Sequence, residues 1–386
     1  MSHTLLDAAA SGGLFVGRVW NPEVEGPSVV SLRGDELIDI TSKRIPTLSA
    51  LLEMDDAAEI TRSATGKSLG TLAEIAANST GKPDRARPYL LAPADLQAIK
   101  ACGVTFAQSM IERVIEEKAA GNPDRAASIR ERVSDLIGGS LNNLKAGSQE
   151  AEKVKQALIA EGMWSQYLEV GIGPDAEVFT KAPVLSSVGW GADVGLHPIS
   201  TWNNPEPEIV LAVNSRGEIR GATLGNDVNL RDVEGRSALL LGKAKDNNAS
   251  CSIGPFIRLF DASYGLDDIR SAELDLKVTG EDGFVLHGKS SMSKISRDPT
   301  DLVRQTCGAH HQYPDGFMLF LGTLFAPTQD RDTPNQGFTH KVGDMVEISS
   351  AGLGSLANTV RLSTECAPWT FGISALMANL GKRGIL

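Results

Sequence analysis

Apolar and polar positions alternate with a period of two along much of the chain after residue 176, which is the spacing typical of β-strands. Some runs are wholly apolar, and these predict strands buried on both faces. The predicted strands cover residues 177–183, 209–213, 272–278, 283–287, 317–321, 341–348 and 352–356, the last two as a hairpin. The second half of the chain is therefore expected to be rich in β-structure.

Helical patterns precede these strands. Residues 95–103 are expected to form a short helix, and residues 104–117 a longer helix with one apolar face. Two charge-rich segments, 124–137 and 149–160, predict further helices with solvated faces. Because helices come first and strands follow without regular βαβ alternation, the order of elements predicts an α+β fold.

The first 95 residues differ in character from the rest. Short apolar runs at residues 14–20 and 28–32 predict strands. Residues 81–88 have the sequence GKPDRARP, which is polar, contains two prolines and predicts a linker. We therefore expect a small N-terminal domain, residues 1–95, followed by a larger catalytic domain, residues 96–386.

The composition is that of a globular protein of enzyme size, with 386 residues of which 41% are hydrophobic. A net charge of −11 argues against nucleic acid or an anionic membrane as the main partner. No stretch approaches the roughly 20 apolar residues of a membrane helix, and the first residues do not resemble a secretory leader. Four cysteines lie far apart without zinc or disulfide spacing. These features predict a cytoplasmic protein with reduced thiols.

Three carboxylates stand out near the middle of the chain. Glu206 and Glu208 are two residues apart where an apolar strand begins, so both side chains are expected on one face. Residues 214–217, Asn-Ser-Arg-Gly, predict a turn into a second apolar run that ends at Asp227. Such a hairpin brings Asp227 back toward the glutamates. Three close carboxylates repel one another strongly when buried, and a hard divalent cation removes that cost.

Six short motifs resemble a known family in their order and spacing. They are Glu206-Pro207-Glu208, Gly225-Asn226-Asp227, Gly242-Lys243, Ile253-Gly254-Pro255, Gly322-Thr323 and Gly343-Asp344. From about residue 103 to 358 the chain resembles the fumarylacetoacetate hydrolase superfamily. The resemblance implies a mixed β-roll in the larger domain, a bound Mg²⁺ (with Mn²⁺ or Ca²⁺ as alternatives) and a homodimer or larger homo-oligomer.

The resemblance also implies roles for individual residues. Glu206, Glu208 and Asp227 match the family's metal ligands. Lys243 matches its active-site lysine, and Thr323 matches a residue that contacts the carboxylate of the substrate.

One departure from the family pattern bears on the reaction. The hydrolases and decarboxylases of the family carry a motif like NYxxHxxE, whereas residues 105–112 read TFAQSMIE, with Ser109 in place of the histidine and Glu112 retained. Serine cannot act as a base near neutral pH, which argues against water-activating C–C bond hydrolysis. The start at Gly103-Val104-Thr105-Phe106, the missing histidine and the extra N-terminal domain resemble instead the family's sugar-acid branch, the 2-keto-3-deoxypentonate dehydratases. Thr105 and Ser109 either line the pocket or cap the helix that carries Glu112. Lys181, in a sequence like the family's FxKxP pattern, either binds substrate or supports a loop.

Dehydration of a 2-keto-3-deoxypentonate of the D-xylonate or D-arabinonate type is the reaction that this resemblance implies. A 2-keto acid offers a carboxylate oxygen and a keto oxygen to Mg²⁺, which acidifies the protons on C3. We expect Glu112 to transfer the C3 proton and Lys243 to orient the carboxylate or hydroxyl, with a base role for Lys243 left open. Loss of water and proton shifts from C5 then give 2,5-dioxopentanoate.

Two other functions are compatible with the same residues. One is an acylpyruvate hydrolase or a β-keto-acid decarboxylase of the same superfamily. The other is a non-catalytic protein that binds a metal or a sugar acid. A product assay separates them, because only the dehydratase yields an aldehyde that a dehydrogenase can oxidise.

Overall fold

The computed structural model describes residues 5–6, 12–120, 122, 125–126, 144–160, 164–325, 327, 329–332, 334 and 337–386. The side chains of residues 107–109, 111 and 116 are likewise outside the description. The predicted helix at residues 124–137 therefore lies almost wholly outside the described residues. Within the described part of the chain, no helix combines the length and the apolar character needed to cross a membrane.

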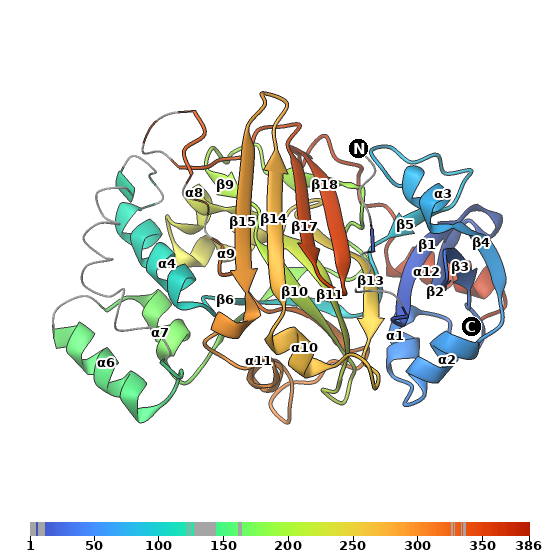
Figure 1. Cartoon of the computed structure of the whole chain (residues 1–386), viewed down its shortest axis with the longest axis horizontal. Coiled ribbons are helices and arrows are strands. Elements are labelled where there is room, and N and C mark those ends of the chain that lie inside the picture. Colours follow the sequence, from blue (N-terminus) through green and yellow to red (C-terminus); the bar gives the residue numbers. More distant parts are fainter. Residues whose placement is uncertain are drawn as a thin grey trace.

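Among the described residues, eleven strands form one large sheet (Figure 1). They are β1 (Phe15–Asn21), β2 (Gly26–Arg33), β3 (Glu36–Asp39), β4 (Lys67–Thr71), β5 (Tyr89–Leu91), β6 (Ala98–Gly103), β7 (Glu177–Ala182), β10 (Pro207–Val213), β11 (Ile219–Asp227), β13 (Cys251–Leu259) and β16 (Phe317–Phe320). Their order is β4-β3-β2-β1-β13-β11-β10-β16-β6-β7, with β5 paired to β1. All pairs are antiparallel except β16 with β6, which run parallel.

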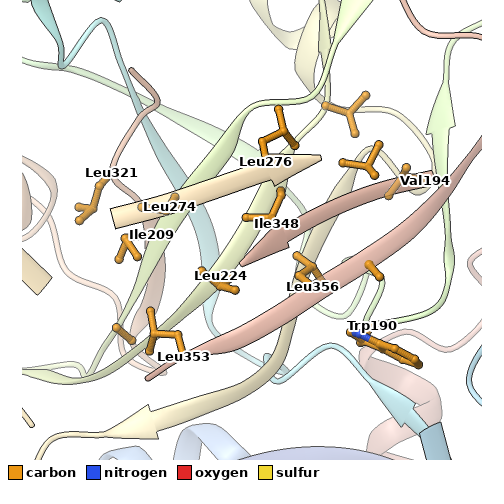
Figure 2. Close-up of a cluster of buried hydrophobic side chains, with 14 of the residues drawn as sticks. Trp190, Val194, Ile209, Leu224, Leu274, Leu276, Leu321, Ile348, Leu353 and Leu356 are labelled. Carbon is orange, nitrogen blue, oxygen red and sulfur yellow. The ribbon is translucent and has the colours of Figure 1, made fainter. Parts of the chain in front are cut away.

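A second sheet covers one face of the first. It has the order β15-β14-β17-β18-β8 and consists of β8 (Asp193–Leu196), β14 (Glu273–Thr279), β15 (Val285–Ser291), β17 (Met345–Ser350) and β18 (Gly354–Leu362). Figure 2 shows the apolar core, in which Leu274 and Leu276 of this sheet lie with Ile209 and Leu224 of the large sheet. Along β14 buried and exposed positions alternate, so its other face meets solvent. The two sheets with their surrounding helices confirm the predicted α+β fold.

The N-terminal strands extend the large sheet, because β1 pairs with β13 through Phe15 opposite Arg258. Beside them Figure 1 places the C-terminal helix α12, where Asn379 Nδ2 donates a hydrogen bond to Val24 O at 2.7 Å. The large sheet thus contains strands from both sides of residue 95. The domain boundary near this residue remains a prediction, as does the homo-oligomer. The helices of this part are α1 (Leu48–Leu52), α2 (Ala57–Ser63), α3 (Leu72–Ala77) and α12 (Ile373–Lys382).

The predicted helix at residues 95–103 is wrong, because this segment contains strand β6. Ala98 pairs with Phe317 of β16, and Lys100 pairs with Thr180 of β7. Six residues with both neighbours far away in sequence give little local signal, so long-range pairing decides their structure.

A helical lobe adjoins this end of the sheet, at the left of Figure 1. It is formed by α4 (Ala107–Ala119), α6 (Gln149–Ala160) and α7 (Gln166–Ile172). The buried side chains Met110, Val114 and Ile115 of α4 pack in one cluster with Leu168 of α7. The predicted apolar face of the helix after residue 103 is therefore confirmed at these positions.

Several short elements complete the fold among the described residues. They are β9 (Asn203–Asn204), β12 (Asn229–Leu230), α8 (Arg231–Glu234), α9 (Leu241–Lys245), α10 (Leu266–Arg270), α11 (Pro299–Thr306) and the 3-10 turns η2 (Pro22–Val24), η3 (Ala238–Leu240) and η4 (Met292–Lys294). Helix α9 contacts both α8 and β7. The chain after Asp227 therefore folds back beside the strand end that carries this aspartate.

Candidate active site

Three buried carboxylates gather at one end of the β10–β11 hairpin. Glu206 precedes β10, Glu208 lies within it, and Asp227 is the last residue of β11. The turn between the strands closes at Gly217, whose φ of +76° suits glycine. One carboxylate oxygen from each residue lies within 4.8 Å of the others. The predicted hairpin and the convergence of its three carboxylates are therefore confirmed.

Backbone and amide groups fix the orientation of this hairpin end. Asp227 N donates to Glu206 O at 3.1 Å, and Glu206 N donates to Asn226 Oδ1 at 3.2 Å. Gly322 N donates to Glu208 Oε2 at 2.6 Å, from the loop that follows β16. Since β16 pairs with β10, the sheet itself sets the position of this donor.

Three cationic side chains surround the carboxylates. Lys245 Nζ donates to Glu206 Oε2 and lies 3.1 Å from Asp227 Oδ2. Arg113 of α4 places Nη2 2.7 Å from Glu206 Oε1. Lys181 of β7 places Nζ 2.8 Å from Asp227 Oδ1. Each cation therefore offsets the negative charge of a carboxylate that would otherwise be unpaired in a low-dielectric interior.

The structure corrects the position of the predicted lysine. Lys243 is exposed on α9 and lies outside the wall of the cavity, whereas Lys245 is 2% exposed and lines it. Residues two positions apart on a helix are separated by about 200° around its axis, so the side chains of Lys243 and Lys245 project from opposite sides of α9. Of the two lysines on α9, Lys245 is the one in contact with the carboxylates.

The carboxylates line a small cavity with further charged groups. Glu234 of α8 lies 2.8 Å from Arg113 Nη1 and belongs to the wall. Among the described residues, the polar and charged side chains on this wall are those of Arg113, Glu177, Glu206, Glu208, Asp227, Glu234, Lys245 and Thr323, beside the thiol of Cys102. Five carboxyl groups thus share the cavity with two cations.

The residues present fit a hard divalent cation. Burial, followed by the charges of Asp227 and Glu206, raises the pKa of Glu208 well above its usual value. Burial acts in the same direction on Asp227, but the neighbouring Lys181 and Lys245 outweigh it and lower the pKa of Asp227. A cation stabilises such crowded negative charge, and carboxylate oxygens are the ligands that Mg²⁺ prefers.

Glu177, the first residue of β7, adds a second kind of carboxyl group. Burial, and next the charge of Glu234, raises the pKa of Glu177 to about 7. Gly103 stands opposite Glu177 in β6, and a side chain there would collide with the Glu177 carboxylate. The glycine therefore leaves room for this carboxyl group. A carboxyl that titrates near neutrality is suited to proton transfer.

The other residues predicted from the sequence occupy different places. Thr323 lines the cavity. Glu112 and Thr105 are buried outside its wall: Glu112 Oε2 lies 3.5 Å from Arg231 Nη2, and Thr105 Oγ1 donates to Leu321 O at 2.7 Å.

Two further predicted residues complete this account. Lys181 is fully buried behind Asp227 and is not part of the wall, so the structure does not support its prediction as a substrate contact. The side chain of Ser109 lies outside the described residues. The sequence patterns do not single out Arg113, Glu177 or Glu234, because none of the three lies in a motif used above.

The motif series is borne out by comparison with a family model. Residues 174–361 match the model described as fumarylacetoacetate (FAA) hydrolase C-terminal. The matched segment includes the β10–β11 hairpin with Glu206, Glu208 and Asp227. This segment, just under half of the chain, is therefore similar to the C-terminal domain of fumarylacetoacetate hydrolases.

Two curated proteins that are similar in sequence to this chain are named as sugar-acid dehydratases. The probable 2-keto-3-deoxyxylonate dehydratase of Haloferax volcanii is 31% identical over 198 residues, which cover 51% of this chain and 64% of the relative. The 2-dehydro-3-deoxy-D-arabinonate dehydratase of Saccharolobus solfataricus is 29% identical over 185 residues, which cover 48% of this chain and 58% of the relative. The chain spans about three fifths of the length of the curated relatives it matches.

Solved structures share the fold over most of the chain. A structure of 2-keto-3-deoxy-D-arabinonate dehydratase complexed with magnesium and 2,5-dioxopentanoate has a TM-score of 0.62 and 20% identity, and covers 90% of this chain and 99% of that chain. A 5-carboxymethyl-2-hydroxymuconate delta-isomerase from Mycobacterium smegmatis has a TM-score of 0.52 and 21% identity, and covers 90% of this chain and 98% of that chain. At these identities the likeness establishes the fold.

Proposed function

We propose that this protein is a Mg²⁺-dependent dehydratase that converts a 2-keto-3-deoxypentonate, of the D-xylonate or D-arabinonate type, into 2,5-dioxopentanoate and water. The observation that carries the proposal is one cavity in which three carboxylates suited to a divalent cation meet a carboxyl group with a pKa of about 7. The names of the two sequence relatives support the choice of substrate. The reaction belongs to oxidative pentose breakdown.

The proposed roles follow from the cavity wall. Glu206, Glu208 and Asp227 hold the cation, and Thr323 offers its hydroxyl group to the carboxylate of the substrate. When bound, Mg²⁺ would supply an electrophilic centre that polarises the keto group and acidifies the C3 protons. Lys245 remains an ammonium group, because Asp227 and Glu206 raise its pKa against the effect of burial. It therefore binds and orients oxygen atoms instead of accepting a proton.

Proton transfer is assigned to Glu177. Its carboxylate accepts a proton from C3 and delivers it to the C4 hydroxyl group, which leaves as water as the C3–C4 double bond forms. Loss of a C5 proton and return of a proton to C3 then give an enol, and protonation of this enol at C4 with loss of its hydroxyl proton gives the aldehyde. The sum is substrate minus one water molecule. Glu112 is not given this role, because its carboxylate pairs with Arg231 outside the wall.

A product assay tests the proposal. The protein is incubated with 2-keto-3-deoxy-D-pentonate and Mg²⁺, with and without excess EDTA, and the product is oxidised by an aldehyde dehydrogenase coupled to NAD(P)⁺ reduction. We expect absorbance at the nicotinamide wavelength to rise only without EDTA. If the metal-loaded protein leaves this substrate and its close homologues unchanged, the proposal is wrong.

The same preparation separates the alternative functions. Release of pyruvate from an acylpyruvate, or of carbon dioxide from oxaloacetate, at a rate above that for the pentonate would identify a hydrolase or decarboxylase. Binding of the sugar acid without turnover, abolished in Glu208→Gln, would identify a binding protein.

A further inference from the structure

Lys181 is a fully buried lysine whose ammonium group has several oxygen atoms as polar partners. Its Nζ lies 2.8 Å from Asp227 Oδ1 and donates to the carbonyl oxygens of Val228, at 3.2 Å, and Lys245. Ser250 Oγ lies 3.4 Å away. The side chain is 0% exposed. An ammonium group has three N–H donors and no acceptor, so this shell of acceptors fits the charged form of Lys181.

The two carboxylate oxygens of Asp227 have different partners because one of them is paired with Lys181. Oδ1 faces Lys181, and Oδ2 lies 3.1 Å from the Nζ of Lys245, one of the two cations on the cavity wall. A carboxylate held through one oxygen cannot rotate without breaking that pair. Lys181 therefore presents Asp227 to the cavity through a single defined oxygen.

The same ammonium group also holds the helix that carries Lys245. The carbonyl of Lys245 is at the last residue of α9, and it accepts hydrogen bonds from both Lys181 Nζ and Ser250 Oγ, the latter at 2.8 Å. Lys181 thus connects strand β7, the end of β11 and the end of α9 at one point. A shift of Lys181 would move a carboxylate ligand and the cavity lysine together.

We propose that Lys181 is a positioning residue that sets the affinity of the cavity for its divalent cation by orienting Asp227 and anchoring α9. It does not touch the substrate. This inference rests on the metal site of the proposed function and adds the residue that holds that site in shape. Groups that orient the ligands of a metal commonly change its affinity about 10- to 100-fold when they are removed.

Metal affinity measured without substrate tests the proposal. Mn²⁺ is titrated into the metal-free full chain and followed by electron paramagnetic resonance of the free ion. We expect Lys181→Met to weaken Mn²⁺ binding at least tenfold. Lys100→Met is the matched control, because Lys100 Nζ also ends on this part of the sheet, 2.9 Å from Thr180 Oγ1, without reaching a carboxylate of the cavity. Its Mn²⁺ affinity should remain within about twofold of the parent, since it contacts no ligand.

A double-mutant cycle distinguishes positioning from general damage to the fold. If Lys181 acts through Asp227, Lys181→Met adds little to the loss caused by Asp227→Asn, so the two effects are far from additive. Additive losses, or parent-like affinity in Lys181→Met, would overturn the proposal. Far-UV circular dichroism establishes that each variant is folded. Should Lys181→Met not fold, Lys181→Gln keeps a hydrogen-bond donor without the charge, and it must then show the weakened affinity.

The two proposals fail in different ways. A parent protein that binds Mn²⁺ but leaves the pentonate unchanged refutes the dehydratase function and leaves the role of Lys181 standing. A parent that binds Mn²⁺ while Lys181→Met binds it equally well refutes only the role of Lys181. A parent that binds no divalent cation refutes both.

Discussion

Gly322 offers the most direct test of how the fold positions a carboxylate of the cavity. Its φ is +89°, and its N–H donates to Glu208 Oε2 at 2.6 Å. A Cβ at this position would collide with Thr105 Oγ1. Thr105 is 1% exposed and its hydroxyl is held by Leu321 O at 2.7 Å, so it has little freedom to move aside.

The expected cost of Gly322→Ala is the sum of two effects. An L-residue in the left-handed region costs about 1–2 kcal/mol. Overpacking against Thr105 adds about 1–3 kcal/mol, so we expect the free energy of unfolding to fall by about 3 kcal/mol. Relief of the collision requires the loop to shift, which moves the N–H away from Glu208. Mn²⁺ affinity should then fall about tenfold or more, as for other lost contacts to a metal ligand.

Gly343→Ala is the matched control for Gly322→Ala. Gly343 also has positive φ, +97°, but the nearest atoms to an added Cβ belong to the exposed side chain of Glu281, at 2.8 Å. That flexible carboxylate can move, so only the backbone strain of about 1–2 kcal/mol remains. Urea denaturation gives both stabilities, and Mn²⁺ titration gives both affinities. Equal stability losses in the two variants, together with parent-like Mn²⁺ affinity in Gly322→Ala, would refute the reasoning.

Three further predictions follow from single contacts. Lys245→Met should abolish measurable dehydration while Lys243→Met leaves kcat/KM within about twofold, because Lys245 lines the cavity and Lys243 does not. The reverse ranking of the two variants would identify Lys243 as the active-site lysine. Because Glu177 must be deprotonated to accept a proton, its pKa of about 7 predicts a kcat/KM that falls about tenfold per pH unit below neutrality. A cation bound nearby can move this limb only to lower pH, and Glu177→Gln should lower kcat by about 10²–10⁴; a limb above neutrality or an active Gln variant would exclude Glu177. Burial alone would raise the pKa of Asp344, but hydrogen bonds with Arg331, at 2.6 Å, and His340 hold that pKa at about 2. The stabilisation that these contacts give the folded state is therefore complete above about pH 4 and is lost as the pH falls through 2. Asp344→Asn should therefore cost about 3 kcal/mol at pH 7 and progressively less in acid, as measured by urea denaturation.

Local patterns were sufficient for the hairpin that carries the three carboxylates. The alternation around Glu206 and Glu208, an apolar run and a turn ending in Gly217 are all contained in 22 consecutive positions from Glu206 to Asp227. Pairing within a hairpin requires no information from distant parts of the chain, so the convergence of Asp227 with the glutamates could be expected. Strand β6 shows the opposite case, because its neighbours in the sheet begin at Glu177 and Phe317. Its conformation depends on partners that no window around residue 100 contains.

Besides long-range strand pairing, short motifs also fail to specify on which side of a helix a residue lies. Lys243 and Lys245 are two positions apart on one short helix, and choosing between them by motif alone reverses the side of the helix. Glu112 and Arg113 are adjacent on α4, yet Glu112 lies by Arg231 and Arg113 by Glu206 and Glu234.

The balance of charge in the cavity explains why these sides matter. Five carboxyl groups line it beside Arg113 and Lys245, and Lys181 stands behind Asp227, so the acidic groups exceed the basic ones by two when all are ionised. One divalent cation equals that difference. Replacing Lys245 by its exposed neighbour Lys243 would leave an excess of three, which a single Mg²⁺ cannot neutralise in a buried site. The proposed metal site therefore depends on cationic side chains from α4, α9 and β7, so its composition is set by the tertiary fold.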